Sequence, residues 1–177
     1  MIIRTALPAD AEAIARVRVE TWRSAYAGIL PAEYLAALSV EESTWRWRET
    51  LLESTRAGTF TLVAEDAAGE VVGFATGGPE RTADPYYSGE IYAIYVHPGS
   101  QRQGAGRALV EAGRQRLVEM GYEKMLIWVL KRNTPSRAFY KAMGGKLWRE
   151  KLVEIGSQLY QEVAYAWDSP LTLPKSG

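Results

Sequence analysis

Runs of apolar residues alternate with short polar turns along the chain, and their spacing separates the expected strands from the expected helices. The clearest run is 91–96, which contains no charge and predicts a strand buried on both faces at the centre of a sheet. Pro98 and Gly99 end this strand, because proline cannot donate to a strand ladder and glycine favours turns. Apolar positions then recur at helical spacing as far as Met120, and 124–130 forms the next buried strand. A strand, a helix and a second strand in this order predict two parallel strands.

The remaining pattern extends this unit at both ends. We expect a strand at 2–6, a helix from 11 to about 25–28, short helices starting near 29 and 41, and hairpins at 59–76 and 146–167. The outline is an α/β fold, with one domain at 1–168 and a mixed sheet of about seven strands flanked by helices. Residues 169–177 contain two prolines and are expected to form a mobile tail.

Composition excludes several classes of site and partner. The 177 residues fit one domain, and 21 basic residues balance 21 acidic residues, so we expect neither nucleic acid nor a membrane surface as a partner. With no cysteine and one histidine, the chain cannot form a disulfide, a thiol nucleophile or a Cys/His zinc site, and no metal is expected. The N-terminus lacks the pattern of a signal peptide, and no apolar run is long enough to span a bilayer. We therefore expect a cytoplasmic protein, and a homodimer is one option for its assembly.

The segment 101–107 lies between the expected central strand and the helix that follows it. Its glycines, Gly104 and Gly106, sit at a helix N-terminus, where unpaired N–H groups and the helix dipole favour an anion such as a diphosphate. A P-loop would need Lys and Ser or Thr after the second glycine, whereas Arg107 follows it here. A dinucleotide fingerprint would need a third glycine where Leu109 stands. Both nucleotide interpretations therefore fail at specific positions.

This segment resembles the acyl-CoA-binding signature of the GNAT superfamily of N-acetyltransferases, a glutamine or arginine followed by two spaced glycines after a strand that ends in Val-x-Pro. Gln101, Gly104 and Gly106 fill the fixed positions, and Val96 and Pro98 precede them. The resemblance implies a single GNAT-like domain that takes acetyl-CoA as its cosubstrate. It also implies that backbone amides cradle the CoA pyrophosphate and that the central strand pairs with the pantetheine arm. The residues so implied are Arg102, Gln103, Gly104, Ala105, Gly106 and Arg107 for the pyrophosphate, and Ile94, Tyr95 and Val96 for the arm.

A second segment, 133–144, supports the same resemblance. Taken alone it predicts a well-capped helix, with Asn133 before a proline, Gly144 at the end and Tyr140 as an ordinary amphipathic residue. Its matches to the second GNAT signature are Asn133, Ser136, Phe139, Tyr140 and Gly144. By resemblance, Asn133 and Ser136 belong to the CoA site, and the Tyr140 hydroxyl points at the CoA sulfur. A glycine stands after Gly144 where the family usually has phenylalanine, which affects packing more than chemistry.

The acceptor side is less specific. The segment 22–31 resembles the acceptor-side segment of a bacterial subgroup that acts on small amines and amino-acid-like compounds. Trp22 and Tyr26 from this segment, together with Tyr92, could line a cleft for an amine, because aromatic faces hold alkyl chains and cations. Each of these residues could equally belong to the core.

Amine acetylation needs a group that removes a proton from an alkylammonium, whose pKa is about 10.4. Glu90, at the start of the central strand, is the candidate, and a solvated charge at a strand end is the alternative. Strict alternation would place Glu90, Tyr92, Ile94 and Val96 on one side of the strand. His97 is expected to be structural or exposed.

The leading hypothesis is an enzyme that moves an acetyl group from acetyl-CoA directly to a primary amine of a small molecule, such as a polyamine or an amino-acid-like compound, with Tyr140 and Glu90 as catalytic residues. A non-catalytic acyl-CoA-binding regulatory module is the first alternative. An acetyltransferase that acts on a protein amine is the second.

Overall fold

The computed structural model describes residues 1–54 and 56–168, so the tail expected at 169–177 lies outside the described residues. The elements expected from the sequence are present, with bounds that differ by a few residues. In chain order they are β1 (Ile2–Thr5), α1 (Ala11–Ala25), α2 (Ala32–Ala36), α3 (Val40–Glu53), β2 (Phe60–Glu65), β3 (Val71–Pro79), β4 (Gly89–Val96), α4 (Ala105–Glu119), β5 (Met125–Leu130), α5 (Thr134–Ala142), β6 (Lys146–Ile155) and β7 (Gln158–Trp167).

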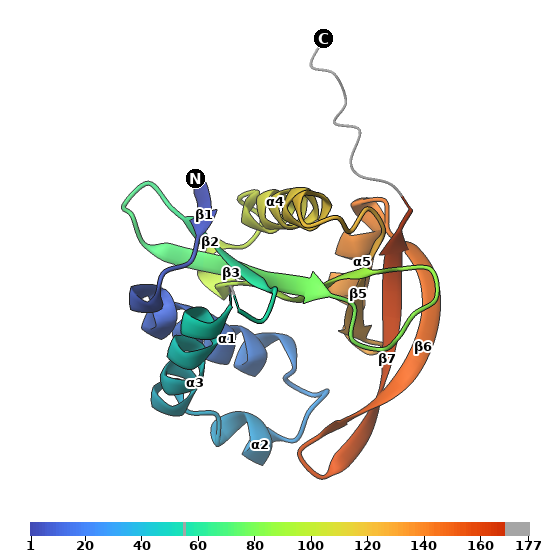
Figure 1. Cartoon of the computed structure of the whole chain (residues 1–177). Coiled ribbons are helices and arrows are strands. Elements are labelled where there is room, and N and C mark those ends of the chain that lie inside the picture. Colours follow the sequence, from blue (N-terminus) through green and yellow to red (C-terminus); the bar gives the residue numbers. More distant parts are fainter. Residues whose placement is uncertain (55, 169–177) are drawn as a thin grey trace.

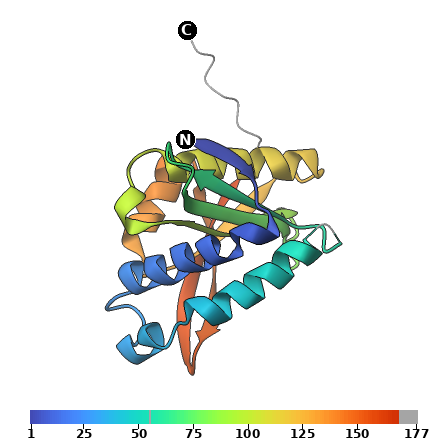
Figure 2. The same ribbon diagram turned by 90° about the vertical axis from the view of Figure 1, so that its left-hand side faces the viewer.

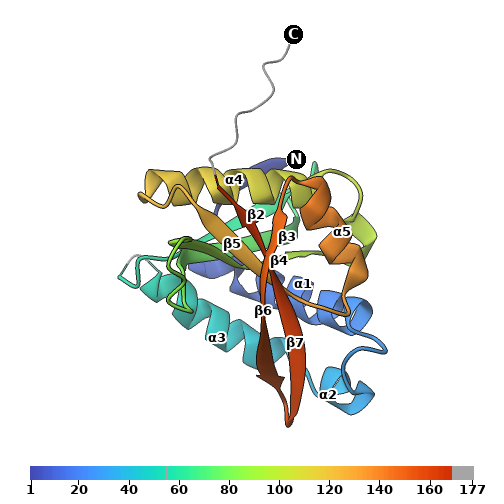
Figure 3. The same ribbon diagram turned by 90° about the vertical axis from the view of Figure 1, so that its right-hand side faces the viewer.

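The strands form one seven-stranded sheet in the order β1-β2-β3-β4-β5-β7-β6 (Figures 1 and 3). Strands β4 and β5 are parallel, as the strand–helix–strand pattern predicts, and the other neighbouring pairs are antiparallel. Helix α4 makes the crossover between the parallel pair. The predicted mixed sheet is therefore confirmed. Its one parallel pair, β4 and β5, lies near the middle, and we call the line where these two strands meet the parallel seam.

Helices cover both faces of the sheet. Helix α4 lies on one face, while α1 and α3 lie side by side on the other (Figures 1 and 2). The core under α4 contains Leu109 and Leu117 together with Ile91 of β4. The core under α1 and α3 contains Ile14 and Phe74. The amphipathic helices thus bury their apolar stripes against the sheet and shield both of its faces from water.

A β-bulge interrupts β4 at Tyr92. Thr76 of β3 pairs with Ala93 while its neighbour Gly77 pairs with Ile91, so Tyr92 is an extra residue in the strand. Because of this residue, Ile91 and Ile94 pack on the same face, toward α4. The alternation predicted from sequence, with Glu90, Tyr92, Ile94 and Val96 on one side, is therefore wrong.

The long β6–β7 hairpin reaches past the sheet toward α2 (Figure 1). There Val153, Ile155 and Tyr160 of the hairpin pack with the segment that joins α1 to α2, around Tyr26 and Leu30. The same cluster includes Leu130, the last residue of β5, so the hairpin and this segment meet beside the end of β5.

Candidate active site

Strands β4 and β5 pair at one end only. Their register joins Gly89 to Met125, Glu90 to Leu126 and Ile91 to Ile127, and no further pair forms along the described strands. Beyond this closed end, β4 still pairs with β3 and β5 still pairs with β7, so the two facing edges have no strand partner. An extended ligand with amide groups can add to such an edge by backbone hydrogen bonds.

Burial follows the same division. Gly89, Glu90 and Ile91 are buried, whereas 92–96 is only partly buried. The prediction of a strand buried on both faces is therefore wrong for its second half, because β5 diverges there. This part of β4 includes Ile94, Tyr95 and Val96, the residues that the sequence assigned to the pantetheine arm.

The segment after β4 has the backbone geometry of an anion site. Arg102 has φ 62° and Gly104 has φ 92°, so two residues of this exposed loop adopt the left-handed conformation before α4 begins at Ala105. Left-handed residues in such loops bring successive N–H groups to one side, and a non-glycine residue held there stores strain of the kind found at functional sites. A Cβ on Gly104 would meet nothing within 4 Å, so the space beside it is open. The loop and the first turn of α4 therefore fit a diphosphate.

Side chains of this loop contact the end of β4. The Gln101 amide donates to the Val96 carbonyl at 3.1 Å, and the Thr21 hydroxyl donates to the same carbonyl at 3.2 Å. The Gln103 amide donates to the Gly99 carbonyl at 3.4 Å. Gln101 thus fixes the loop against the strand, and the Val96 carbonyl already has two donors.

Helix α5 borders the other side of the open seam. Asn133 caps it, accepting a hydrogen bond from the Ser136 amide at 3.2 Å, and Asn133 is buried. In the described chain the side-chain nitrogen of Asn133 has no hydrogen-bond partner. That group is free to donate to a ligand in the seam.

Tyr140 of α5 is buried among aromatic rings. Its ring centre lies 5.5 Å from Phe139, 6.1 Å from Tyr165 and 6.4 Å from Trp167. Burial raises the Tyr140 pKa well above its usual 10, and the nearby Tyr95 phenol raises the pKa further, so the hydroxyl keeps its proton at neutral pH. This hydroxyl makes no hydrogen bond with any described residue. It can therefore donate a proton to a ligand atom.

The predicted acceptor residues do not all lie together. The Trp22 ring centre is 4.9 Å from Tyr26 and 6.4 Å from Tyr95, so these three aromatic rings form one cluster. Tyr92 is occupied elsewhere, since its hydroxyl donates to the Pro79 carbonyl at 2.7 Å and the Arg81 guanidinium lies 4.0 Å above its ring. The aromatic cluster therefore contains Trp22, Tyr26 and Tyr95 but not Tyr92.

Glu90 is enclosed at the closed end of the seam. Its side chain is 1% exposed, and Arg81 donates to one carboxylate oxygen at 2.5 Å and to the other at 3.3 Å. The Arg81 backbone amide also donates to Glu90, at 3.1 Å. A solvated charge at a strand end is therefore ruled out, and the carboxylate is held by a guanidinium that sequence reasoning did not connect with it.

A second carboxylate, Glu162 of β7, was not anticipated. It lies in the ladder between Leu130 of β5 and Lys151 of β6, and the Lys151 ammonium is 3.7 Å away. Burial raises the Glu162 pKa, the Glu90 charge also raises it, and Lys151 lowers it. Its pairing partner Leu130 packs with Tyr26 and Trp22, so Glu162 lies near the aromatic cluster. Its charge also raises the pKa of Tyr26 and Tyr95. The sequence feature that could have pointed to Glu162 is its position as a single acidic residue directly before the apolar run 163–167.

His97 has a structural environment. Its Nε2 lies 2.6 Å from a Glu20 carboxylate oxygen, and its Nδ1 accepts from the Gly99 amide at 3.2 Å. Within the part of the chain that the structure describes, no group of three or more His, Cys, Asp or Glu residues could hold a metal. Over the same residues, no helix is long and apolar enough to cross a membrane.

Known proteins share this architecture. The chain is 39% identical over 165 residues to the uncharacterized N-acetyltransferase YuaI of Bacillus subtilis, covering 93% of this chain and 91% of that protein. The PaiA N-acetyltransferase of Thermoplasma acidophilum, solved with coenzyme A, superposes with a TM-score of 0.72 at 22% identity, covering 91% of this chain and 96% of that one. The putative acetyltransferase yncA of Salmonella typhimurium, solved with acetyl-CoA, superposes with a TM-score of 0.68 at 21% identity, covering 100% and 99%.

These structural neighbours show the fold, while the family is shown by sequence. Residues 18–144, which include the second half of α1, the open seam, the glycine loop and α5, match the family described as Acetyltransferase (GNAT) family. The matched segment ends at the glycine that closes the second signature. With this match and the YuaI relative together, the chain belongs to the GNAT family of acetyltransferases.

Proposed function

We propose that this acetyltransferase moves an acetyl group from acetyl-CoA to a primary amine of a small molecule. The observation that carries the proposal is the open end of the β4–β5 seam. On α5 it has the hydroxyl of Tyr140, which has no hydrogen-bond partner among the described residues, and on β7 it has the partly buried carboxylate of Glu162 near the aromatic cluster. A proton donor and a proton acceptor on the two sides of one opening are what amine acetylation requires.

The CoA part of acetyl-CoA would lie along this opening. In the proposal, the amides of 102–107 hold its pyrophosphate, and backbone groups near Ile94 and Tyr95 pair with its pantetheine arm. Asn133 and Ser136 contact the arm from α5. The left-handed loop, the unpartnered edge of β4 and the free amide nitrogen of Asn133 support this placement.

Acetyl-CoA supplies an activated acetyl group, and the chain's own residues manage two protons. One proton leaves the acceptor ammonium before its nitrogen can form the new C–N bond. The other leaves the nitrogen as it becomes an amide, and it replaces the proton that the Tyr140 hydroxyl gives to the sulfur as the C–S bond breaks. The high pKa of Tyr140 suits this role because the phenol is protonated when the thiolate departs.

Glu90 stays our proposed base, and Glu162 is a second candidate favoured by a specific observation. Both oxygens of Glu90 accept hydrogen bonds from Arg81, so a proton would reach Glu90 only in competition with a guanidinium. Within the part of the chain that the structure describes, the one ion pair of the Glu162 carboxylate is the 3.7 Å contact to Lys151, and its raised pKa makes it a stronger base than an ordinary glutamate. A water chain could link either carboxylate to the amine.

The proposed function is tested by measuring CoA thiol release with a panel of small primary amines, followed by mass spectrometry of the products. We expect thiol release and a mass gain of one acetyl group with at least one class of small amine. Acetylation of peptides or proteins with no small amine accepted would contradict the proposal. Glu90→Gln and Glu162→Gln then separate the two bases, because the true base loses kcat/KM most strongly below the amine's own pKa.

A further inference from the structure

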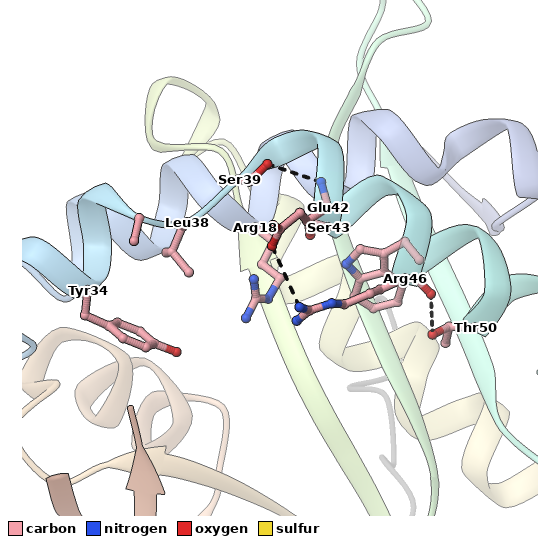
Figure 4. A pocket seen from close by; sticks show the side chains of 10 residues that line it. Arg18, Tyr34, Leu38, Ser39, Glu42, Ser43, Arg46 and Thr50 are labelled. Carbon is pink, nitrogen blue, oxygen red and sulfur yellow. Dashed lines mark hydrogen bonds and ion pairs between the residues drawn. The ribbon is translucent and has the colours of Figure 1, made fainter. Parts of the chain in front are cut away.

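A pocket of about 370 Å³ lies between α1, α2 and α3. Figure 4 shows that Arg18 and Arg46 extend their guanidinium groups into it and that the Tyr34 ring borders it from α2. Among the described residues that line it, the one acid is Glu42, which lies 3.8 Å from Arg46. The pocket therefore carries more positive than negative charge.

Arg18 is the unusual member of this pocket. It is partly buried and, within the described chain, forms neither an ion pair nor a hydrogen bond. Its neighbours on the same helix differ, since Arg16 pairs with Glu12 at 2.9 Å and Arg23 donates to the Leu38 carbonyl at 2.7 Å. A guanidinium carries five N–H donors in a planar fork that matches a carboxylate or a phosphate. Arg18 therefore has donors that a ligand can use.

The position of Arg18 connects the pocket to the acetyl-transfer site. Its guanidinium carbon lies 4.5 Å from the centre of the Trp22 ring, and Trp22 contacts Tyr26 and Tyr95. The Arg18 charge acts on the Tyr95 phenol, and Tyr95 in turn acts on Tyr140. Arg18 thus lies against one side of the aromatic layer formed by Trp22, Tyr26 and Tyr95.

Charges of opposite sign flank this aromatic layer. Arg18 acts on Tyr95 from α1, and Glu162 acts on Tyr95 and Tyr26 from β7. A molecule lying over the layer would meet a carboxylate at one end and a guanidinium at the other. This arrangement complements a zwitterion, and it opposes a polyamine, whose second cation would approach Arg18.

Resting on the proposed function, we propose that Arg18 binds the acidic group of the acceptor, so that the acceptor is an amino acid or a related compound bearing both an amine and a carboxylate or phosphonate. The amine end lies toward Glu162 and the thioester. The acidic end enters the pocket of Figure 4, where Arg46 and Tyr34 offer further donors.

The test compares acceptors that differ only in the acidic group. Each L-amino acid of a panel is assayed beside the amine that lacks only its carboxylate, and spermidine is included as a polyamine. We expect wild-type kcat/KM to be about 10- to 100-fold higher for the acid-bearing member, the range of a lost charge-assisted hydrogen bond. Arg18→Gln should remove that preference by raising KM for the acid, and it should change kcat/KM for the carboxylate-free amine less than about 2-fold.

Two variants serve as controls. Arg16→Gln removes a guanidinium from the same helix, at a position that is 57% exposed and paired with Glu12, and it should leave both acceptors unaffected. Arg18→Lys keeps the charge without the planar fork and should restore part of the preference. Calorimetry with acetyl-CoA and thermal melting confirm that each variant binds the cosubstrate and is folded.

The outcomes separate this inference from the proposed function. Thiol release with carboxylate-free amines or spermidine at rates equal to the amino acids would overturn the inference and leave the proposed function standing. An equal loss of kcat/KM for both acceptors in Arg18→Gln would also overturn it. No release with any small amine, although acetyl-CoA binds, would contradict both.

Discussion

The closed and open ends of the β4–β5 seam show how one pair of strands serves two purposes. At the closed end, backbone pairing is complete, and the buried carboxylate of Glu90 has its countercharge in Arg81. At the open end, the facing strand edges and the Tyr140 hydroxyl have no hydrogen-bond partner in the described chain, and neither does the Arg18 guanidinium beside the nearby aromatic layer. Groups satisfied inside the fold stabilise it, whereas groups left unsatisfied at a protected opening are available to ligands. Substitutions at the two ends should therefore affect different measurements, except at Glu90, which we also propose as the base.

The largest effect is expected at the open end, from Tyr140→Phe. Loss of the proton donor should lower kcat by about 10²- to 10⁴-fold, with a much smaller change in KM for acetyl-CoA, because general-acid help acts in the transition state. Steady-state and single-turnover kinetics measure this. Tyr122→Phe, near the closed end, is the matched control and should leave kcat unchanged. Wild-type single-turnover rates in Tyr140→Phe would reduce Tyr140 to a packing residue.

At the closed end, the corresponding substitution is Arg81→Ala. It leaves the buried Glu90 carboxylate without its guanidinium, which should cost about 3 kcal/mol of unfolding free energy. Urea denaturation measures this loss. Adding Glu90→Gln should recover part of it, because the uncompensated charge is then gone. If Arg81→Ala and the double variant were equally stable, the ion pair would not be what satisfies Glu90.

Gly104→Val tests the glycine loop against a closely matched position. Gly104 has φ +92° and Gly121 has φ +91°, and an added Cβ meets nothing within 4 Å at either position. Both valine variants should lose about 1–2 kcal/mol of stability from left-handed strain. Only Gly104→Val should weaken acetyl-CoA binding, by about 10-fold or more, because only that glycine lies beside the proposed pyrophosphate site. Calorimetry would contradict the assignment if the two variants bound acetyl-CoA equally well.

The smallest expected effect is a pH-dependent gain in stability from Glu162→Gln. Folding raises the Glu162 pKa, so the folded protein binds this proton more tightly than the unfolded chain does, and the charged carboxylate lowers stability once the pH exceeds the unfolded pKa. The glutamine variant should be more stable than wild type at pH 7, by less than about 1 kcal/mol, and equally stable near pH 3. Urea denaturation at both pH values measures this. A variant less stable at pH 7 would mean that the Lys151 contact outweighs burial.

Much of this architecture could be predicted because its signals are local. The apolar run of β4, the glycines before α4 and the cap at Asn133 each fix a nearby backbone conformation, and the parallel seam follows from the order of elements. The residues assigned to acetyl-CoA come from a resemblance to two family signatures that are also local, and their assignment stays a prediction. None of these predictions depended on which side chains meet across the sheet.

The rest depended on contacts between distant segments. The bulge at Tyr92 is a property of the pairing between β3 and β4, and a single sequence carries no sign of it. Arg81 meets Glu90 because a polar loop folds back over the strand. Glu162 and Arg18 reach the aromatic cluster from β7 and α1, which lie far apart in the chain. The acceptor side was therefore the part that sequence reasoning described least.

The three-pair closed end also has a consequence for motion. Strands β1 to β4 form one antiparallel group of strands, and β5, β7 and β6 form another. The strand pairing between the two groups consists of three residue pairs. A seam this short favours sub-global opening, in which one group separates before the whole domain unfolds. Acetyl-CoA bound between these two groups of strands would contact both and hold them together. We therefore expect its binding to slow amide hydrogen exchange in β5 and β7 as well as in the residues that touch it.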